Sequence, residues 1–295
     1  MTVPDDGPTP DDAFRFTFDR YRSLLDRLRE ANARFRRFED DGRSADTDGD
    51  DEQEPARPTV FLRHDVDWSP RKARQLAEIE SKRGIEATYF FLASATAYNP
   101  LDRETRAAID EIESRGHAVG VHVDLRDVDG DPDVERVGER IERERAVLAA
   151  AGAEPVPAVS FHNPPDWVIG RRLGLDGVVN AYAPRFIREA TYRADSNQRW
   201  RSEPPLDGNA EKGRNVARGG IPDRLQLLTH PVLWGERDAW TVDRLREERD
   251  YHDERLARSL ARTDRTWDGP RGLGSAFDSE ATTDGASEPG PESGD

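Results

Sequence analysis

Carboxylate and imidazole side chains stand where apolar segments of this sequence end. Asp65 and Asp67 follow the apolar residues 59–62, and His64 precedes them. In an extended chain, residues two apart share a face, so the two carboxylates point to one side and His64 points to the other. Two neighbouring carboxylates either bind a cation or drive one another's pKa apart, and both outcomes suit catalysis. The alternative is a turn at the end of a strand with two solvated aspartates.

Further histidines at the ends of apparent strands strengthen the case for a site. His122 lies in a segment where valines alternate with polar or small residues. One face of that segment is therefore aliphatic, and the other offers His122 and Asp124 as potential ligands. His162 and His230 each follow another apolar segment. His117 is five residues before His122, so it falls on the opposite face and is predicted to be structural.

The elements that must position these side chains follow a repeated strand–helix pattern. We predict strands at 59–65, 87–93, 118–123 and 156–161. The helices between them are predicted at 69–84, over a segment that ends at 116, and at 131–152. Proline at the first turn and glycine just past the end mark such helices, as Pro70 and Gly84 do. Repeated units of this kind imply a parallel sheet with its site at the carboxyl ends of the strands. A helix at 18–32, short strands at 177–181 and 225–229, and a last helix at 239–261 complete the prediction.

The chain of 295 residues is long enough for one large α/β domain, which we place at residues 13–264. Residues 39–57 contain nine acidic and two basic side chains and almost no apolar ones. Such a segment cannot bury enough surface to become ordered, so we expect a disordered acidic loop within the domain. Residues 1–12 and 265–295 are predicted to be disordered for the same reason.

Composition excludes several classes of function. The formal net charge of −16 argues against nucleic-acid binding, which needs a basic surface. Because the chain has no cysteine, any metal must be held by imidazoles and carboxylates. No segment approaches the length of a membrane span and the N-terminus shows no export signal, so we expect a cytoplasmic protein.

The acidic excess also predicts a halophilic protein. Only Lys72, Lys82 and Lys212 are lysines among 44 basic residues. A GC-rich genome is the alternative explanation for the scarcity of lysine. We expect the fold to need molar salt, because screening relieves the repulsion between acidic side chains. Thermal unfolding across a salt series measures this, and a melting temperature that does not change with salt would contradict it.

Six short motifs occur in an order that resembles the polysaccharide deacetylase superfamily, the carbohydrate esterases with NodB homology. They lie at residues 64–67 (His-Asp-Val-Asp), 88–91 (Thr-Tyr-Phe-Phe), 116–122 (Gly-His-x-x-Gly-x-His), 161–164 (Phe-His-Asn-Pro), 195–200 (Asp-Ser-x-x-x-Trp) and 228–231 (Leu-Thr-His-Pro). The resemblance covers about residues 14–262 and is greatest to a branch whose first motif is His-Asp-Val-Asp. It implies a distorted (β/α)7 barrel, similar to a TIM barrel, with the site at the carboxyl ends of the strands.

The resemblance also implies roles for individual residues. In the superfamily a divalent metal, usually zinc, is held by one Asp of the first motif and two His of the second. Carried over, Asp67 is a metal ligand and Asp65 the base that activates water, with the reverse order left open. His122 is a metal ligand, and His230 is the acid that protonates the leaving amine. The second metal histidine would stand at position 126, where this sequence has Arg126.

A second departure concerns the arginine that steadies the catalytic aspartate in the superfamily, because the matching residue here is His162. One explanation covers both departures: His162 supplies the missing imidazole. Asp67, His122 and His162 then suffice, since zinc accepts three protein ligands and a water molecule. Asp124 is the fallback ligand or a partner of a ligand. The alternative is a site that has lost its metal.

The implied activity is hydrolysis of a carbon–nitrogen bond that is not a peptide bond: removal of an N-acetyl group from an amino sugar. The residues predicted to bind the carbohydrate or sugar-conjugate substrate are Asp124, Asn163, Asp195 and Trp200. Trp200 would offer a flat apolar face to a sugar ring, and core packing is the alternative for that side chain. The alternative functions are a metal-independent hydrolase of a small non-sugar amide and a catalytically silent glycan-binding barrel.

Overall fold

The structure, a computed structural model, describes residues 13–41, 57–126, 133–206 and 221–263. The disorder predicted for residues 1–12 and 265–295, and for most of the loop at 39–57, concerns segments outside these residues. The chain divides into two units, residues 1–244 and 245–295. In the second unit the described residues belong to helix α6 (Thr241–Thr263). The candidate site lies entirely in the first unit.

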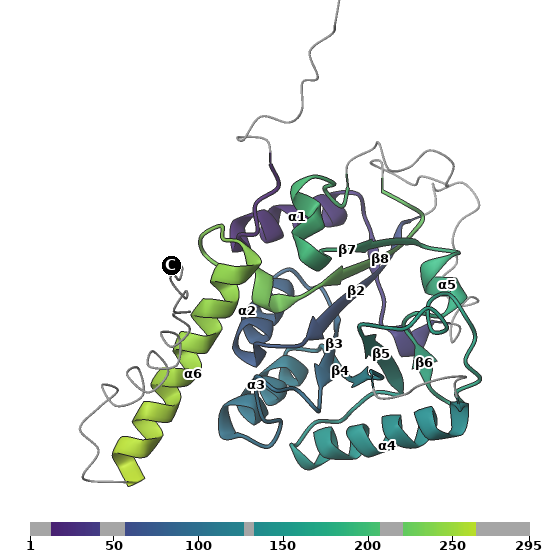
Figure 1. The fold of residues 1–295 in the computed structure, drawn as a ribbon. Helices are drawn as coiled ribbons and strands as arrows, with labels where there is room; N and C mark the ends of the chain where they lie inside the picture. The colour runs from purple at the N-terminus through teal and green to yellow at the C-terminus, as the bar shows by residue number, and fades with distance from the viewer. Residues whose placement is uncertain (1–12, 42–56, 127–132, 207–220, 264–295) are drawn as a thin grey trace, which may run out of the picture. The chain divides into compact units, whose positions relative to one another are not determined.

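The first unit is built on a parallel sheet that curls without closing (Figure 1). The strands run in the order β6-β5-β4-β3-β2-β8-β7, and β1 pairs with the start of β2. Their bounds are β1 (Arg34–Phe35), β2 (Thr59–Val66), β3 (Thr88–Leu92), β4 (Ala118–Asp124), β5 (Ala158–His162), β6 (Val179–Asn180), β7 (Thr191–Ala194) and β8 (Arg224–Thr229). Within the described residues β6 and β7 share no ladder, so the barrel has a seam. The predicted distorted α/β barrel is confirmed.

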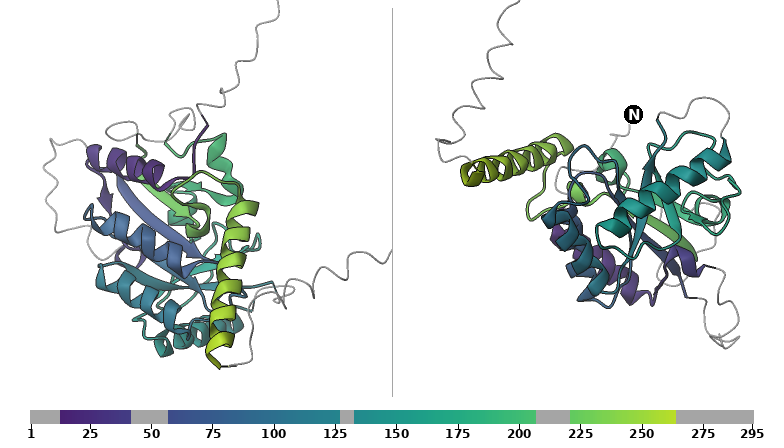
Figure 2. Two further views of the ribbon diagram at one scale, coloured as in Figure 1. Left: turned by 90° about the vertical axis from the view of Figure 1, so that its left-hand side faces the viewer. Right: turned by 90° about the horizontal axis from the view of Figure 1, so that it is seen from below.

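Helices cover the outer side of the curled sheet (Figure 1, Figure 2). They are α1 (Phe18–Glu30), α2 (Pro70–Ser81), α3 (Arg103–Ser114) and α4 (Val134–Ala150). The short α5 (Pro184–Ile187) follows β6 and is not one of them, because its Phe186 packs inside the curl. The side chains of Thr17, Ser69, Asp102 and Asp133 each accept a backbone N–H at a helix start. These caps satisfy amide groups that have no partner inside the helix. They explain why the predicted helix boundaries lie within a few residues of the observed ones.

An apolar cluster fills the inside of the curl on the amino-terminal side of the site. It consists of Phe38, Phe61, Phe90, Ala158, Ala181 and Phe186. The ring of Phe186 lies 4.8 Å from that of Phe38 and 5.0 Å from that of Phe61, measured between centroids. Phe61 is four residues before Asp65 on the same face of β2. The polar side chains at the carboxyl ends therefore stand on an apolar floor, where the dielectric constant is low and electrostatic interactions are strong.

Gly120 on β4 makes room for Phe90 in this floor. A Cβ atom at position 120 would lie 2.6 Å from Cε1 of Phe90. We expect Gly120→Ala to lower the free energy of unfolding by about 1–3 kcal/mol, as overpacking of a core does. Gly138→Ala in α4 is the matched control, because a Cβ there meets no atom within 4 Å. It should raise stability by about 0.5–1 kcal/mol, since alanine favours the helix. Urea unfolding measures both, and equal effects would contradict the packing argument.

A polar cluster, the outer cluster, is buried where β2 and β3 meet α1 and α2. Its members are Tyr21, His64, Glu80, Tyr89, His117 and Thr229. Glu80 accepts hydrogen bonds from the hydroxyls of Tyr21 at 2.5 Å and Tyr89 at 2.7 Å. Nε2 of His64 lies 2.9 Å from Glu80, and its Nδ1 lies 2.6 Å from Oγ1 of Thr229 on β8. Burial raises the pKa of Glu80, but His64 and the other partners more than offset this, and the pKa lies below its usual value. His64 thus points away from the site, as predicted.

His117 belongs to the same outer cluster. Its Nδ1 accepts the backbone N–H of Ala87 at 3.2 Å, and its Nε2 lies 3.0 Å from the carbonyl oxygen of Ala77. An amide N–H can only donate and a carbonyl can only accept, so the ring is neutral with its proton on Nε2. Burial, the largest influence, lowers the pKa of His117, which agrees with a neutral ring. The prediction that His117 is structural is confirmed.

Candidate active site

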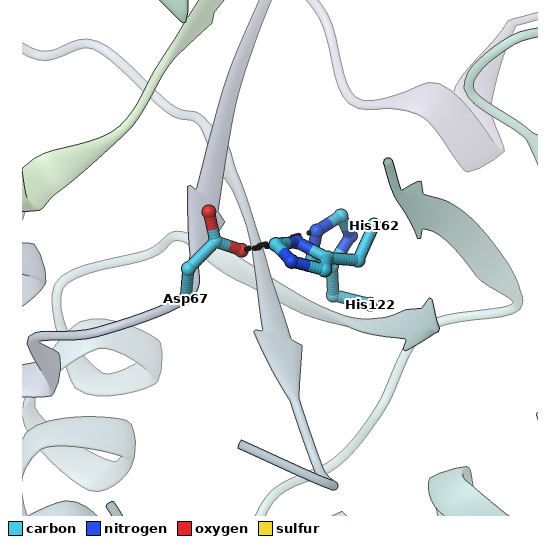
Figure 3. A group of neighbouring side chains, drawn as sticks. All are labelled: Asp67, His122 and His162. Carbon is cyan, nitrogen blue, oxygen red and sulfur yellow. Dashed lines mark ion pairs between the residues drawn. The ribbon is translucent and has the colours of Figure 1, made fainter. Parts of the chain in front are cut away.

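The three side chains predicted as metal ligands meet at the carboxyl ends of three strands (Figure 3). Asp67 follows β2, His122 lies on β4, and His162 is the last residue of β5. Oδ1 of Asp67 lies 3.1 Å from Nε2 of His122 and 3.2 Å from Nδ1 of His162. One ligand atom from each of the three residues lies within 4.8 Å of the other two. The spacing allows all three to contact one ion.

Asp67, His122 and His162 are called the metal-type cluster below. The electrostatics of this cluster also suit a cation. Oδ1 of Asp67 is buried, and the imidazole nitrogens of His122 and His162 are its near polar neighbours. Burial raises the pKa of Asp67, but His122 and His162 lower it more strongly, so the carboxylate is ionised. A buried anionic oxygen is unfavourable unless a cation or a proton donor compensates it. One carboxylate and two imidazoles are a donor set that fits zinc or a similar divalent ion.

Asp65 lies deeper on the same face of β2 and is held by Arg63. The guanidinium donates from Nε to Oδ1 at 2.9 Å and from a terminal nitrogen to Oδ2 at 2.7 Å. Burial raises the pKa of Asp65, but Arg63 and then His122 bring it below its usual value. Oδ2 of Asp65 also lies 3.8 Å from Nε2 of His122. An ionised carboxylate therefore stands next to the metal-type cluster, able to accept a proton.

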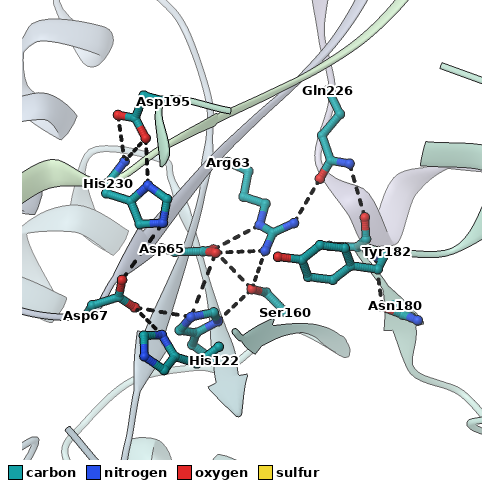
Figure 4. A network of polar contacts seen from close by, with 12 residues as sticks. Arg63, Asp65, Asp67, His122, Ser160, Asn180, Tyr182, Asp195, Gln226 and His230 are labelled. Carbon is teal, nitrogen blue, oxygen red and sulfur yellow. Dashed lines mark hydrogen bonds and ion pairs between the residues drawn. The ribbon is translucent and has the colours of Figure 1, made fainter. Parts of the chain in front are cut away.

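Arg63 is a residue of the candidate site that the sequence analysis did not predict. It is fully buried, its guanidinium donates to Oε1 of Gln226 at 3.2 Å, and its Cζ lies 4.3 Å from the ring centroid of Tyr182 (Figure 4). The signal was present: a charged residue within a buried strand, two positions before an aspartate, shares the face of that aspartate. Arg63 holds Asp65 from the same strand, whereas the resemblance placed such an arginine at position 162.

His230 follows β8 and faces Asp67, with its Nε2 3.9 Å from Oδ2 of that carboxylate. Its Nδ1 lies 2.6 Å from Oδ1 of Asp195, which also accepts the backbone N–H of His230 and the indole N–H of Trp234. Burial lowers the pKa of His230, but Asp195 raises it more, to about 9. The imidazole is therefore protonated at neutral pH and presents Nε2–H to the metal-type cluster.

Two residues predicted to bind substrate, Asp195 and Trp200, do not face the cluster of Asp67, His122 and His162. Asp195 is fully buried, and its oxygens are taken up by His230 and Trp234. It holds the ring and the backbone N–H of His230. Trp200 is 1% exposed and packs against Phe14, Phe16 and Trp234. The prediction that Trp200 offers a face to a sugar ring is wrong, because an aromatic core cluster covers the indole.

The remaining predicted residues lie beside the metal-type cluster. Asp124 accepts hydrogen bonds from the backbone N–H of Arg126 at 3.0 Å and from its Nε at 2.7 Å. The Arg126 side chain is 70% exposed, so position 126 adds no group to the cluster. Asn163, next to His162, is exposed and has φ of 45°, in the left-handed region that asparagine tolerates. A contact of Asp124 or Asn163 with substrate stays a prediction.

No protein-family model matches the chain, and no curated protein matches it. Solved structures do match, among them a family 4 carbohydrate esterase from Streptomyces lividans in complex with acetate. That match has 16% identity, covers 69% of this chain and 88% of the esterase, and has a TM-score of 0.35. No helix among the described residues is long and apolar enough to cross a membrane.

Two further solved structures extend this picture. A carbohydrate esterase family 4 pseudoenzyme from Bacillus anthracis has 17% identity over 68% of this chain and 63% of its own, with a TM-score of 0.39. A peptidoglycan deacetylase from Bdellovibrio bacteriovorus has 12% identity over 65% of this chain and 49% of its own, with a TM-score of 0.35. At these values the likeness carries no argument. The structural neighbours named here are a family 4 carbohydrate esterase, a pseudoenzyme of that family and a peptidoglycan deacetylase.

Proposed function

We propose that this protein is a metal-dependent hydrolase that removes an N-acetyl group from an amino sugar. One observation carries the proposal: a buried, ionised Asp65 and a protonated His230 both border the cluster of Asp67, His122 and His162. Hydrolysis of an amide needs a base for the water and an acid for the amine, and these two groups have the required protonation states. The metal-type cluster between them is where the acetyl carbonyl group would lie.

The chemistry assigned to the chain is a pair of proton transfers. Asp65 takes a proton from the attacking water while the new C–O bond forms at the acetyl carbon. His230 donates the proton on Nε2 to the sugar nitrogen while the C–N bond breaks, which yields acetate and a free amine. An amine leaves only when protonated, whereas an alkoxide leaves more readily. Hydrolysis of an amide therefore needs a proton donor at the nitrogen, and protonated His230 beside the cluster is the group proposed for this.

The charges of the site leave room for one cation. Three carboxylates, Asp65, Asp67 and Asp195, face Arg63 and protonated His230, so these five groups together keep one negative charge. A divalent ion held by Asp67 and the two imidazoles would restore the balance. When bound, such an ion polarises the carbonyl group and lowers the pKa of water.

The metal assignment predicts the effect of removing one ligand. We expect His162→Ala to weaken metal binding by at least about 10–100-fold. Loss of a residue that only hydrogen-bonds to a metal ligand costs this much, and loss of a ligand should cost no less. His252→Ala on α6, outside the site, is the matched control and should bind metal as the wild type does. Titration of chelator-treated protein in high salt measures the dissociation constants. Unchanged affinity in His162→Ala would remove His162 from the site and make Asp124 the better candidate.

The activity is tested by acetate release from a panel of N-acetylated sugars, sugar nucleotides and simple amides. Release from the sugars by metal-loaded protein is the expected result. Release from simple amides by metal-free protein would instead support a metal-independent amide hydrolase. Protein that binds metal yet releases no acetate from any compound of the panel would contradict the proposed function and leave a glycan-binding barrel as the remaining reading.

A further inference from the structure

Ser160 lies where Asp65 and the metal-type cluster meet (Figure 4). It is fully buried on β5, two residues before His162 and on the same face. Its Oγ lies 2.7 Å from a terminal nitrogen of Arg63, 3.0 Å from Oδ1 of Asp65 and 2.6 Å from Nδ1 of His122. One hydroxyl thus contacts a permanent donor, an anionic acceptor and a ring nitrogen of a proposed metal ligand.

The number of protons in these contacts fixes their direction. A serine hydroxyl has one proton to donate and two lone pairs to accept with. Arg63 can only donate, so it uses one lone pair of Oγ. Ionised Asp65 can only accept, so it receives the hydroxyl proton. The remaining contact joins a lone pair of Oγ to Nδ1 of His122, and it is a hydrogen bond only if Nδ1 carries a proton.

We propose that Ser160 is a positioning residue that holds His122 with its proton on Nδ1 and keeps Nε2 free for a metal. The inference rests on the metal site of the proposed function and adds to it a residue that contacts no metal. Nε2 is the nitrogen that lies 3.1 Å from Oδ1 of Asp67, inside the metal-type cluster. An imidazole binds a metal through the nitrogen without a proton, and the hydrogen bond of the other nitrogen decides which one that is.

The opposite arrangement is unfavourable at two points. If Ser160 donated to Nδ1 of His122, its Oγ and Oδ1 of Asp65 would face one another at 3.0 Å with no proton between them. A neutral His122 would then carry its proton on Nε2, where the metal must bind. Asp65, through Ser160, thus favours the form of His122 that accepts a metal, and the base and the ligand share one hydroxyl.

The test combines the position of the histidine proton with metal affinity. In metal-free wild-type protein, at a pH where His122 is neutral, ¹⁵N NMR should place its proton on Nδ1. In Ser160→Ala the proton should move toward Nε2, where Asp67 can accept it, and the dissociation constant for zinc should rise about 10–100-fold. Ser160→Thr keeps the hydroxyl and should keep both properties. Val159→Ala, buried on the opposite face of β5, removes bulk without a hydroxyl and should also behave as the wild type.

Two results would overturn the role of Ser160. One is a neutral wild-type His122 with its proton on Nε2, which can be observed even if Ser160→Ala fails to fold. The other is a folded Ser160→Ala protein that keeps the Nδ1 proton and the wild-type affinity for zinc. Wild-type protein that binds no zinc would overturn the proposed function instead, and the NMR measurement on that same protein would still decide whether Ser160 sets the proton position.

Discussion

Asp65→Asn is expected to slow amide hydrolysis by about 10²–10⁴-fold, the usual contribution of a positioned proton transfer. Asparagine keeps the size of the side chain but cannot accept the proton of the attacking water. Metal content should stay that of the wild type, because the three proposed ligands are intact. The turnover number for acetate release and the bound metal per chain measure the two effects. Asp110→Asn, an exposed residue on α3, is the control for loss of a carboxylate far from the site.

His230→Ala should cost a similar factor, because it removes the acid. The two losses should be far from additive, since both groups serve one transition state. A double variant that is slower by the product of the two factors would contradict a shared transition state. Loss of metal in Asp65→Asn would exchange the roles of Asp65 and Asp67, the order that the motif resemblance leaves open.

Arg63→Met should destabilise the protein by about 3–5 kcal/mol, the effect of removing one partner of a buried ion pair. Arg63 and Asp65 are 0% and 2% exposed, so the carboxylate left behind would be buried without its counter-charge. The pKa of Asp65 should then rise, because burial dominates once the guanidinium is absent. Urea unfolding at constant molar salt measures the stability.

Two further variants sharpen this measurement. Arg74→Met breaks an ion pair with Glu111 whose side chains are 40% and 39% exposed, and it should cost about 0–1 kcal/mol. Arg63→Met combined with Asp65→Asn should cost less than the sum of the single changes, because the remaining side chain is neutral. Strictly additive costs would show that Arg63 stabilises the core through its packing on Tyr182 rather than through Asp65.

The predictable part of the fold is the part with clear local signals. The strands that became β2 to β5 are apolar segments between helices with proline, glycine or side-chain caps, and their order along the chain implied a parallel sheet. β7 was missed because its four residues, Thr-Tyr-Arg-Ala, include a charge and show no apolar run. β1 spans only two residues and exists because it pairs with Thr59 and Val60, a contact that local sequence does not report.

The candidate site divides in the same way. Asp65, Asp67 and His122 could be placed by strand alternation, which fixes the face of a side chain once the strand is known. The contacts of Ser160 and Arg63 depend on which strands lie opposite one another inside the curl. A single sequence does not reveal how far apart the side chains of two such strands are. The prediction for Trp200 was wrong for a related reason. Nothing in the local sequence shows that Phe14 and Phe16, from the distant N-terminal segment, cover its ring.

Strand β2 is polar on both of its faces, and this restricts how it can pair. Arg63 and Asp65 point inward to Ser160, whereas His64 points outward to Glu80 and Thr229. A slip of one residue against β3 and β8 would turn every β2 side chain to the other face. The inner ion pair would then face the helices, the imidazole would enter the site, and buried groups on both sides would lose their partners together. The outer cluster therefore acts as a register lock: the alignment of Asp65 and Asp67 is enforced from the side of the sheet opposite the candidate site.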